Sequence, residues 1–167
     1  KIQTFLPSRD FTKSAKILDY RRLGKQRLEG LQLHNIITGK VPKFKNGSKI
    51  TGWIYHPAAI MWVGYKDALA YYVNEMIREW KKRGYNNSME FIKHKKSFDL
   101  PPFVGLKRFH SIHRAKLLGK DFDFYSKYNW IEKPLDAIHP YFWPSEINKS
   151  TDIVTHVNGE THKMLFK

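Results

Sequence analysis

The chain has 167 residues, enough for one domain with a sizeable core but short for two. Lysine and arginine outnumber aspartate and glutamate by 30 to 15, so the chain carries +15 at pH 7 and favours a polyanionic partner such as a nucleic acid. Because it has no cysteine, disulfide frameworks, thiolate nucleophiles and cysteine-based zinc sites are excluded. No stretch has the roughly 18 apolar residues that span a bilayer, and no secretory signal is visible, so we expect a cytoplasmic protein without a membrane partner.

The first part of the chain predicts a short extended start followed by two helices. Residues 2–6 are mostly apolar and end at a proline, which indicates a brief extended element. Asp10 or Thr12 can cap a short helix. The run from Asp19 to Thr38 then predicts a long helix, which stops at the following glycine. A basic segment over residues 40–51 has the composition of an exposed loop, with a secondary role in nonspecific phosphate contact.

The longest predicted helix begins at Pro57, a favourable first-turn residue, and runs to about Arg83. Its apolar residues recur every three or four positions, the pattern of a buried stripe: Trp62, Tyr65, Leu69, Tyr72, Met76 and Trp80. His56 either caps this helix or lines a functional site. Residues 88–94 are compatible with one short helix, and residues 106–119 predict another that is rich in basic side chains.

The last part of the chain changes character, because prolines and aromatic residues alternate between residues 130 and 144. This composition indicates an irregular segment that packs over the helices. Two short strands flank Asn158-Gly159, a strong signal for a two-residue hairpin. The sequence therefore predicts a mainly α fold: a compact single-domain helical bundle over residues 1–145, with a C-terminal β-hairpin extension of the same domain over residues 146–167.

Charged side chains of the second predicted helix are the first functional candidates. At about 100° per residue, Arg22, Lys25 and Glu29 share one face, whereas Arg27 falls on the apolar side and needs a partner there. Two helical turns therefore hold four cations, namely Arg21, Arg22, Lys25 and Arg27. The cations repel each other unless anions lie against them, and DNA phosphates would supply those anions. A solvated helix with a Lys25–Glu29 ion pair has the same pattern, so this alternative stays open.

Several motifs carry a further indication: Gln3-Thr4-Phe5-Leu6-Pro7, Tyr20-Arg21-Arg22-Leu23, Leu23-Gly24-Lys25-Gln26-Arg27, the Gly39 stop, His56-Pro57, Lys82-Arg83-Gly84-Tyr85 and His113-Arg114. In this combination the chain resembles the pyrimidine-dimer DNA glycosylase family, of the phage endonuclease V type and its bacterial relatives. The resemblance covers roughly residues 1–145. It implies one compact, mainly helical domain whose N-terminal segment threads between helices toward the DNA.

The same resemblance implies a DNA-repair glycosylase with abasic-site lyase activity, which needs neither a metal nor another cofactor. In this family the N-terminal α-amine attacks the sugar C1′ of a damaged nucleotide, forms a Schiff base and then cleaves the strand by elimination. An α-amine with a pKa of about 7.7–8.0 is partly neutral at pH 7, as a nucleophile must be. If the numbering is that of the mature chain, Lys1 carries that amine. The expected partner is double-stranded DNA with a damaged or modified pyrimidine, bound by a monomer.

An ungapped match places Ile2 at an active-site arginine of the family and Arg22 at its essential glutamate. The nearby carboxylates of this chain belong to Asp19 and Glu29, and Glu29 is either the catalytic group or an ion-pair partner of the helix. The candidate catalytic residues are therefore Lys1, Glu29 and Arg22. The expected nucleic-acid contacts are Arg21, Lys25, Gln26, Arg27, His56, His113, Arg114 and Lys116.

Other functions stay open at this point. A DNA- or RNA-binding protein that kept the fold and lost the catalytic glutamate fits the same residues, and so does a metal-dependent nuclease that acts on RNA. His110, His113 and His139 suggest a metal site, but no His-Glu-x-x-His pattern accompanies them. Tyr141 and Trp143 either stack on bases or cover the helices.

Overall fold

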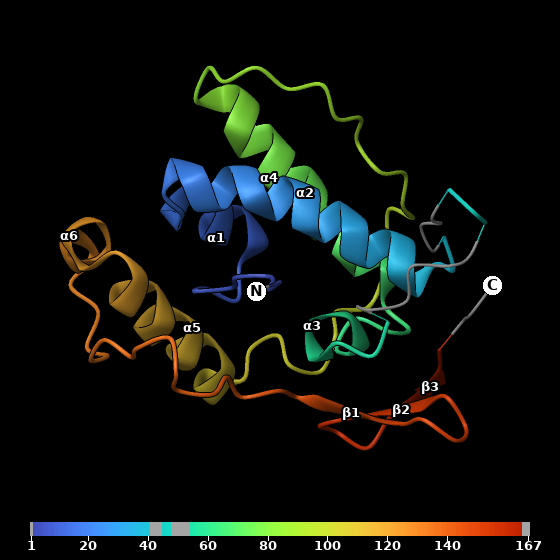
Figure 1. The fold of residues 1–167 in the computed structure, drawn as a ribbon. Helices are drawn as coiled ribbons and strands as arrows, with labels where there is room; N and C mark the ends of the chain where they lie inside the picture. Colours follow the sequence, from blue (N-terminus) through green and yellow to red (C-terminus); the bar gives the residue numbers. More distant parts are fainter. Residues whose placement is uncertain (1, 41–44, 48–53, 165–167) are drawn as a thin grey trace.

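A computed structural model describes residues 2–40, 45–47 and 54–164 of the chain. This described part contains six α-helices, one 3₁₀ turn and a three-stranded antiparallel sheet (Figure 1). In chain order they are α1 (Phe11–Ile17), α2 (Tyr20–Ile37), α3 (Pro57–Ile60), α4 (Lys66–Lys82), α5 (Lys107–Lys120), α6 (Phe122–Tyr125), the 3₁₀ turn η1 (Ser126–Tyr128), β1 (Ser145–Asn148), β2 (Ile153–His156) and β3 (Thr161–Lys163). The prediction of one mainly helical domain with strands at its C-terminal end is confirmed. Lys1 and most of the predicted loop 40–51 lie outside the described residues.

The first two helices begin where their capping residues predict, and the second ends just before the predicted glycine. The Asp10 side chain accepts a hydrogen bond from Lys13 N at the start of α1, and the Asp19 side chain accepts one from Arg22 N at the start of α2. Each bond satisfies a backbone donor that the first helical turn leaves without a partner. α2 ends before Gly39, which has the positive φ of 82° that favours glycine.

The long helix predicted from Pro57 to Arg83 is wrong in one respect, because the structure divides it into α3 and α4. Residues 61–64 form a turn, and Tyr65 N donates to Trp62 O over 2.8 Å. Gly64 has a φ of 90°, which a helix cannot contain. A Cβ atom at this glycine would lie 2.5 Å from the His162 ring of β3. The break therefore brings the C-terminal sheet against the helices.

The apolar stripe of this region forms the centre of the core, as its spacing predicts. Trp62, Leu69, Tyr72 and Met76 are fully buried, and Trp80 is partly buried at the end of α4. Burial of one such side chain stabilises the fold by about 1.5–3 kcal/mol. Figure 1 shows that α4 crosses behind α2, so the stripe is covered by the apolar face of α2.

The short helix considered over residues 88–94 does not form. Asn74 is buried on α4, and its side chain accepts a hydrogen bond from Ile92 N and donates one to Ile92 O, both over 2.8 Å. These bonds satisfy backbone groups that would otherwise join a helix, so the segment runs irregularly along α4. The next predicted helix is confirmed as α5, displaced by one residue.

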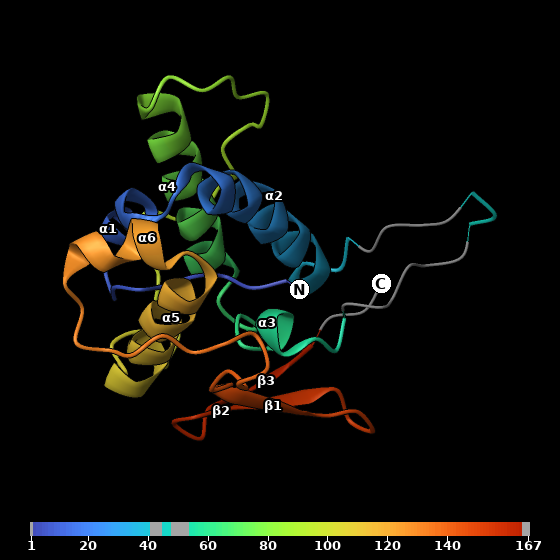
Figure 2. The same ribbon diagram turned by 60° about the vertical axis from the view of Figure 1, so that its left-hand side comes forward.

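The C-terminal strands form a sheet in the order β1-β2-β3, which packs beside α3 (Figure 2). The predicted hairpin forms, but its turn has three residues instead of two: Thr155 pairs with Thr161, His156 N donates to Glu160 O over 2.8 Å, and residues 157–159 connect the strands, with Gly159 at a φ of 88°. β1 was not predicted, and it pairs with β2 in a register that places Ser145 opposite His156. Val154 and Met164 are buried in the same core as the helices. The boundary placed at residue 145 stays a prediction.

Aromatic residues between the helices and the sheet pack over the core, as the composition of this segment predicts. Trp130, Tyr141, Phe142 and Trp143 are partly buried against the hydrophobic cluster. Among the described residues, no helix combines the length and the apolar character that a membrane crossing requires.

Candidate active site

The described chain opens with a buried segment, residues 2–7, that runs between α2 and α5 (Figures 1 and 2). The Gln26 side chain of α2 forms the hydrogen bonds to this segment that a neighbouring strand would form in a sheet. Phe5 N donates to Gln26 Oε1 over 2.8 Å, and Gln26 Nε2 donates to Gln3 O over 2.9 Å. The Tyr72 hydroxyl lies 2.8 Å from Phe5 O and 2.6 Å from Gln26 Oε1, and its single proton is shared between these two acceptors. The segment is therefore fixed by side chains because it has no neighbouring strand.

Two histidines of α5 hold the other side of this segment. Leu6 N donates to His113 Nδ1 over 2.9 Å, and His110 Nδ1 lies 2.8 Å from Leu6 O. The second ring nitrogen of His110 accepts from Gly105 N over 2.8 Å, so Nδ1 of this ring carries the proton. Burial lowers the pKa of His110 and lowers the pKa of His113 to about 3. Both rings are therefore neutral near pH 7, as these bonds require.

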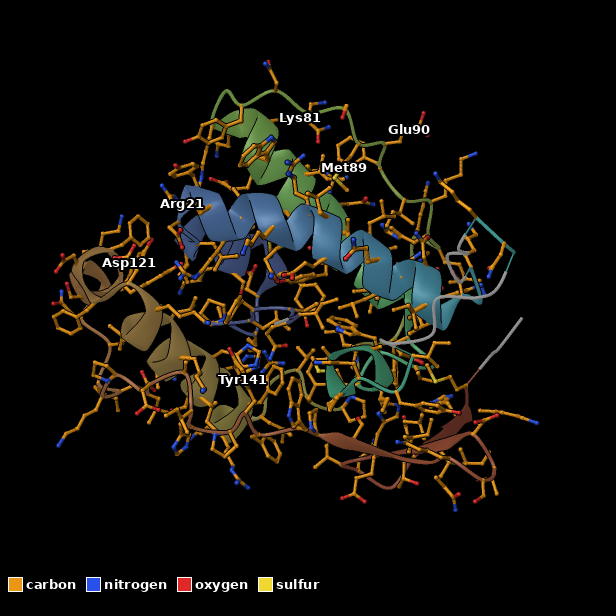
Figure 3. All side chains as sticks on the ribbon, viewed as in Figure 1. Arg21, Lys81, Met89, Glu90, Asp121 and Tyr141 are labelled. Carbon is orange, nitrogen blue, oxygen red and sulfur yellow. The ribbon has the colours of Figure 1, made fainter. Side chains whose placement is uncertain are left out.

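A cavity of about 570 Å³ lies at the start of this segment and along α2. Its lining combines polar, aromatic and charged side chains: Gln3, Phe5, Arg21, Arg22, Lys25, Gln26, Glu29, Lys120 and Tyr141. Four of these side chains are cationic and one is acidic, so the lining carries three net positive charges. Figure 3 shows Arg21 at the start of α2 and Tyr141 below it beside α5. We call this space the cationic cavity.

Glu29 is the acidic residue among those that line the cationic cavity. It is half-buried, and its carboxylate accepts a hydrogen bond from Gln26 Nε2 over 3.3 Å. Burial raises the pKa of Glu29 and outweighs the opposing effect of Lys25. A carboxyl group with a raised pKa is partly protonated nearer to neutral pH and can serve as a proton donor. This environment is compatible with acid–base chemistry, and the catalytic role of Glu29 stays a prediction.

Arg22 is held in place by an acidic residue of the same helix start. Its guanidinium forms a 3.2 Å ion pair with Asp19, which is buried. The Tyr125 hydroxyl donates a hydrogen bond to the same carboxylate, and Asp19 N donates to that hydroxyl over 3.1 Å. The two candidate carboxylates therefore have different roles: Asp19 neutralises Arg22, and Glu29 faces the cavity.

Arg21 and Lys25 are exposed at the rim of the cationic cavity. Arg21 Nε donates to the Tyr20 hydroxyl over 3.2 Å, and this hydrogen bond raises the pKa of Arg21. Arg21 therefore keeps its charge, and both side chains are placed where a phosphate can approach. Their assignment as nucleic-acid contacts stays a prediction that this position supports.

Arg27 has the partner that its apolar position requires, but it does not line the cavity. Its guanidinium carbon lies 4.2 Å from the ring centroid of Trp80, and Nη1 donates to Asn87 Oδ1 over 2.8 Å. Burial lowers the pKa of Arg27. The face of α2 that carries Arg27 is thus separate from the face that carries Glu29.

The structure places two predicted DNA contacts with their side chains inside the protein, which speaks against a direct contact with DNA. His113 is 1% exposed and holds Leu6, as described above. Lys116 is 2% exposed, and its ammonium group donates to Asp136 O over 2.9 Å and to His139 O. Lys116 therefore ties the irregular segment before Tyr141 to α5 and is not available to a phosphate.

Three further predicted contacts, Arg114, His56 and Gln26, form hydrogen bonds within the protein. Arg114 forms a bidentate ion pair with Glu132, with a shortest distance of 2.7 Å, and donates to Pro7 O over 2.9 Å. His56 caps α3, since its Nδ1 accepts from Ala58 N over 3.0 Å, and burial lowers its pKa. His56 is therefore a capping residue and is absent from the described lining of the cavity. Gln26 lines the cavity, and its amide group forms hydrogen bonds with the N-terminal segment and with Glu29.

The structure adds wall residues that the sequence did not assign to the site, namely Gln3, Phe5 and Lys120, and it places there Tyr141, for which base stacking was one of two interpretations. The Tyr141 ring lies edge-on to His113 at 5.8 Å, and the Lys116 ammonium lies 4.8 Å from its centroid. Burial raises the pKa of Tyr141 to about 12, so its hydroxyl stays protonated. Tyr141 thus both covers the helices and faces the cavity.

A larger cavity of about 1010 Å³ lies between the start of α4, residues 95–102 and β3, but its charges balance. Its lining has three lysines and three acidic residues: Lys66, Lys95, Lys163, Asp67, Asp99 and Glu160. A balanced lining does not select a polyanion, so the cationic cavity is the better candidate for DNA. In the part of the chain that the structure describes, no three His, Asp or Glu side chains are placed to hold a metal ion.

Comparison with protein families matches residues 2–93 to the pyrimidine dimer DNA glycosylase family. The chain belongs to this family. The match covers the N-terminal segment and α1 to α4, and so includes Gln26, Glu29 and the rim cations. The family is that of DNA glycosylases acting on pyrimidine dimers, which makes DNA the substrate class. No curated protein and no solved structure matches the chain.

Proposed function

We propose that this member of the pyrimidine dimer DNA glycosylase family removes a damaged pyrimidine from duplex DNA and then cleaves the abasic strand as a lyase, as a monomer and without a metal or cofactor. One observation carries the proposal. A half-buried carboxyl group, Glu29, lies among four cations in a cavity that the buried start of the chain reaches through Gln3.

Binding in this proposal relies on the charges of the cationic cavity. Extrusion of a nucleotide from a duplex costs a few kcal/mol, and a damaged pair costs least to open. Charge-assisted hydrogen bonds from Arg21, Arg22 and Lys25 to phosphates offset that cost. Phe5 and Tyr141 provide apolar walls for the extruded nucleotide.

The proposed nucleophile is the α-amine of the mature chain, which attacks C1′ of the damaged nucleotide. The C1′–N bond breaks, and the base leaves with its electron pair and takes up a proton. The sugar ring then opens to a Schiff base between C1′ and the amine. Loss of a proton from C2′ expels the 3′ phosphate oxygen and cleaves the strand. The hydrogen bonds of Gln26 to Gln3 and Phe5 fix the path by which the amine approaches.

Glu29 is the proposed acid in this sequence. It protonates the ring oxygen as the sugar opens and stabilises the positive charge of the imine afterwards. Its raised pKa increases the protonated fraction near neutral pH. The surrounding cations stabilise the carboxylate that forms when the proton is transferred. Arg22 takes a binding role in place of the family's glutamate, because Asp19 holds it as a cation.

A second candidate function is a DNA-binding protein without catalysis. Arg22 favours it, since an arginine stands where the family's glutamate is expected and a guanidinium cannot act as the acid of the reaction. Such a protein would bind dimer-containing DNA with the salt dependence of phosphate contacts and would leave the DNA intact.

Borohydride trapping on duplexes with one pyrimidine dimer or one abasic site separates the two functions. We expect a covalent protein–DNA adduct with the wild-type chain and with Glu90→Gln, a control carboxylate that lies beyond the end of α4 (Figure 3). Glu29→Gln is expected to bind both duplexes and to form little adduct. Absence of an adduct from the wild-type chain on both duplexes would contradict catalysis and favour the second candidate. Intact-mass measurement of the mature protein identifies the residue that owns the amine.

A further inference from the structure

Beside the cationic cavity, three aromatic rings and two guanidinium groups form a continuous row. The Arg27 guanidinium lies 4.2 Å from the Trp80 centroid, and the Trp80 and Tyr85 centroids are 4.4 Å apart at an interplanar angle of 32°. Tyr85 is 5.9 Å from Tyr20 at the same angle, and the Arg21 guanidinium lies 5.7 Å from the Tyr20 centroid. We call Tyr20, Trp80 and Tyr85 the aromatic row. Because Arg21 also lines the cationic cavity, the row reaches its rim.

Contacts with the backbone fix the inner end of the row. Trp80 approaches α2 closely because residue 24 is glycine, where a Cβ atom would lie 3.0 Å from the Trp80 ring. The Trp80 indole donates to Asn86 O over 2.7 Å, and Arg27 Nη1 donates to Asn87 Oδ1 over 2.8 Å. The end of α4, the turn that follows it and α2 are therefore joined into one rigid surface.

The outer end of the row is exposed to solvent. Tyr20 is 50% exposed and Tyr85 is 40% exposed, although a tyrosine ring is a large apolar surface. Adjacent exposed rings of this size mark an interaction surface more often than scattered apolar residues do. The surrounding charge is positive: Arg78 and Lys81 lie over the exposed Phe91 ring on the same end of α4, at 5.0 and 5.4 Å.

Exposed rings among cations fit one kind of polymer, a nucleic-acid strand with accessible bases. Base faces stack on aromatic side chains, and the phosphates between them match the guanidinium and ammonium groups. Bases inside a duplex already stack on their neighbours, so their faces are closed to the protein. The occupant of the row is therefore a base that has left the duplex stack.

We infer that the aromatic row binds unpaired nucleobases of the DNA beside the damaged nucleotide, by stacking on Tyr20 and Tyr85 while Arg21 contacts the adjoining phosphate. This inference deepens the proposed function, because it names locally single-stranded DNA as part of the substrate. It also assigns the two faces of α2 separate tasks: the Glu29 face carries the chemistry, and the Tyr20 face holds the opened strand.

The test is binding of two single-stranded oligonucleotides of equal length and charge, one of thymidines and one of abasic tetrahydrofuran residues. Fluorescence anisotropy at fixed salt gives the preference for bases over backbone. The wild-type chain is expected to prefer the thymidine strand by at least about fivefold, the effect of one stacked base. Tyr20→Ala/Tyr85→Ala is expected to lose that preference and to keep the affinity for the abasic strand.

Two control variants separate stacking from other causes. Tyr20→Phe/Tyr85→Phe keeps the rings without the hydroxyl groups and is expected to keep the preference. Phe122→Ala removes an exposed ring of α6 outside the row and is expected to behave as wild type. If the double alanine variant does not fold, Tyr20→Leu is measured in its place, because leucine keeps the apolar bulk at this half-exposed position. A preference that persists without the rings, or that the phenylalanine variant loses, overturns the inference.

This measurement is independent of catalysis. A wild-type chain that forms the borohydride adduct but shows no preference for bases refutes the aromatic row and leaves the proposed function standing. A chain that forms no adduct but shows a preference dependent on Tyr20 and Tyr85 refutes the lyase and supports the aromatic row.

Discussion

Replacement of Gln26 by leucine tests how the N-terminal segment is held in the site. Leucine has a similar size but can neither accept from Phe5 N nor donate to Gln3 O, and Gln26 is only 1% exposed, so water does not substitute. Each orphaned buried group costs about 1–3 kcal/mol. The two groups that lose their partner are Phe5 N and Gln3 O, because the Tyr72 hydroxyl can still donate to Phe5 O. The free energy of unfolding is therefore expected to fall by about 2–6 kcal/mol.

Urea unfolding followed by circular dichroism measures this loss, and the thermal midpoint is expected to fall by at least about 4 °C in a domain of this size. Gln32→Leu, an exposed position on the same helix, is the matched control and should stay within about 0.5 kcal/mol of wild type. The borohydride adduct per folded molecule should also decrease for Gln26→Leu, because the segment that leads to the site loses its anchor. Equal stability of the two leucine variants, together with an unchanged adduct yield, would refute this reasoning.

The remaining predictions concern charge and protonation. Glu29→Gln should slow single-turnover adduct formation by about 100-fold or more while binding of a dimer-containing duplex stays within twofold, and a rate near wild type would exclude Glu29 as the acid. His113 has a pKa of about 3 in the folded chain and about 6.5 when unfolded, so only the unfolded state takes up its proton as the pH falls. Stability is therefore lost below about pH 6.5, and His113→Phe should reduce this loss by about 1.4 kcal/mol per pH unit between pH 6 and 4, measured by urea unfolding. Lys25→Ala should reduce the slope of log binding constant against log salt concentration for duplex DNA by about one. Lys96→Ala, at an exposed position outside the cationic cavity, is the control and should leave this slope unchanged.

Helix ends and residue spacing could be predicted from the sequence because they depend on neighbours a few positions apart. Asp19 as a cap, the glycine after residue 38 and the apolar stripe from Trp62 to Met76 are features of this kind. The break at Gly64 could not be predicted in the same way, since its reason is the approach of His162 from a strand about a hundred residues later. The failure of a helix at residues 88–94 has a similar cause, the buried side chain of Asn74.

The same distinction between local and long-range causes applies to the functional residues. The cations of α2, the family and the candidate acid Glu29 follow from the sequence. Their environment does not: the walls of the cavity include Lys120 and Tyr141, which tertiary packing brings to α2. Burial, which raises the pKa of Glu29 and closes His113 to DNA, is likewise a property of the packed chain.

The sequence by itself determined a basic, mainly helical member of a DNA-repair family and the helix that carries its charges, because composition, periodicity and motifs are local. Only the tertiary structure decided which charges face a cavity and which serve the fold. Leu6 and His113 lie 107 positions apart and share a hydrogen bond. Contacts over such separations set burial, and burial decides whether a histidine, lysine or carboxylate meets DNA, a backbone group or another side chain.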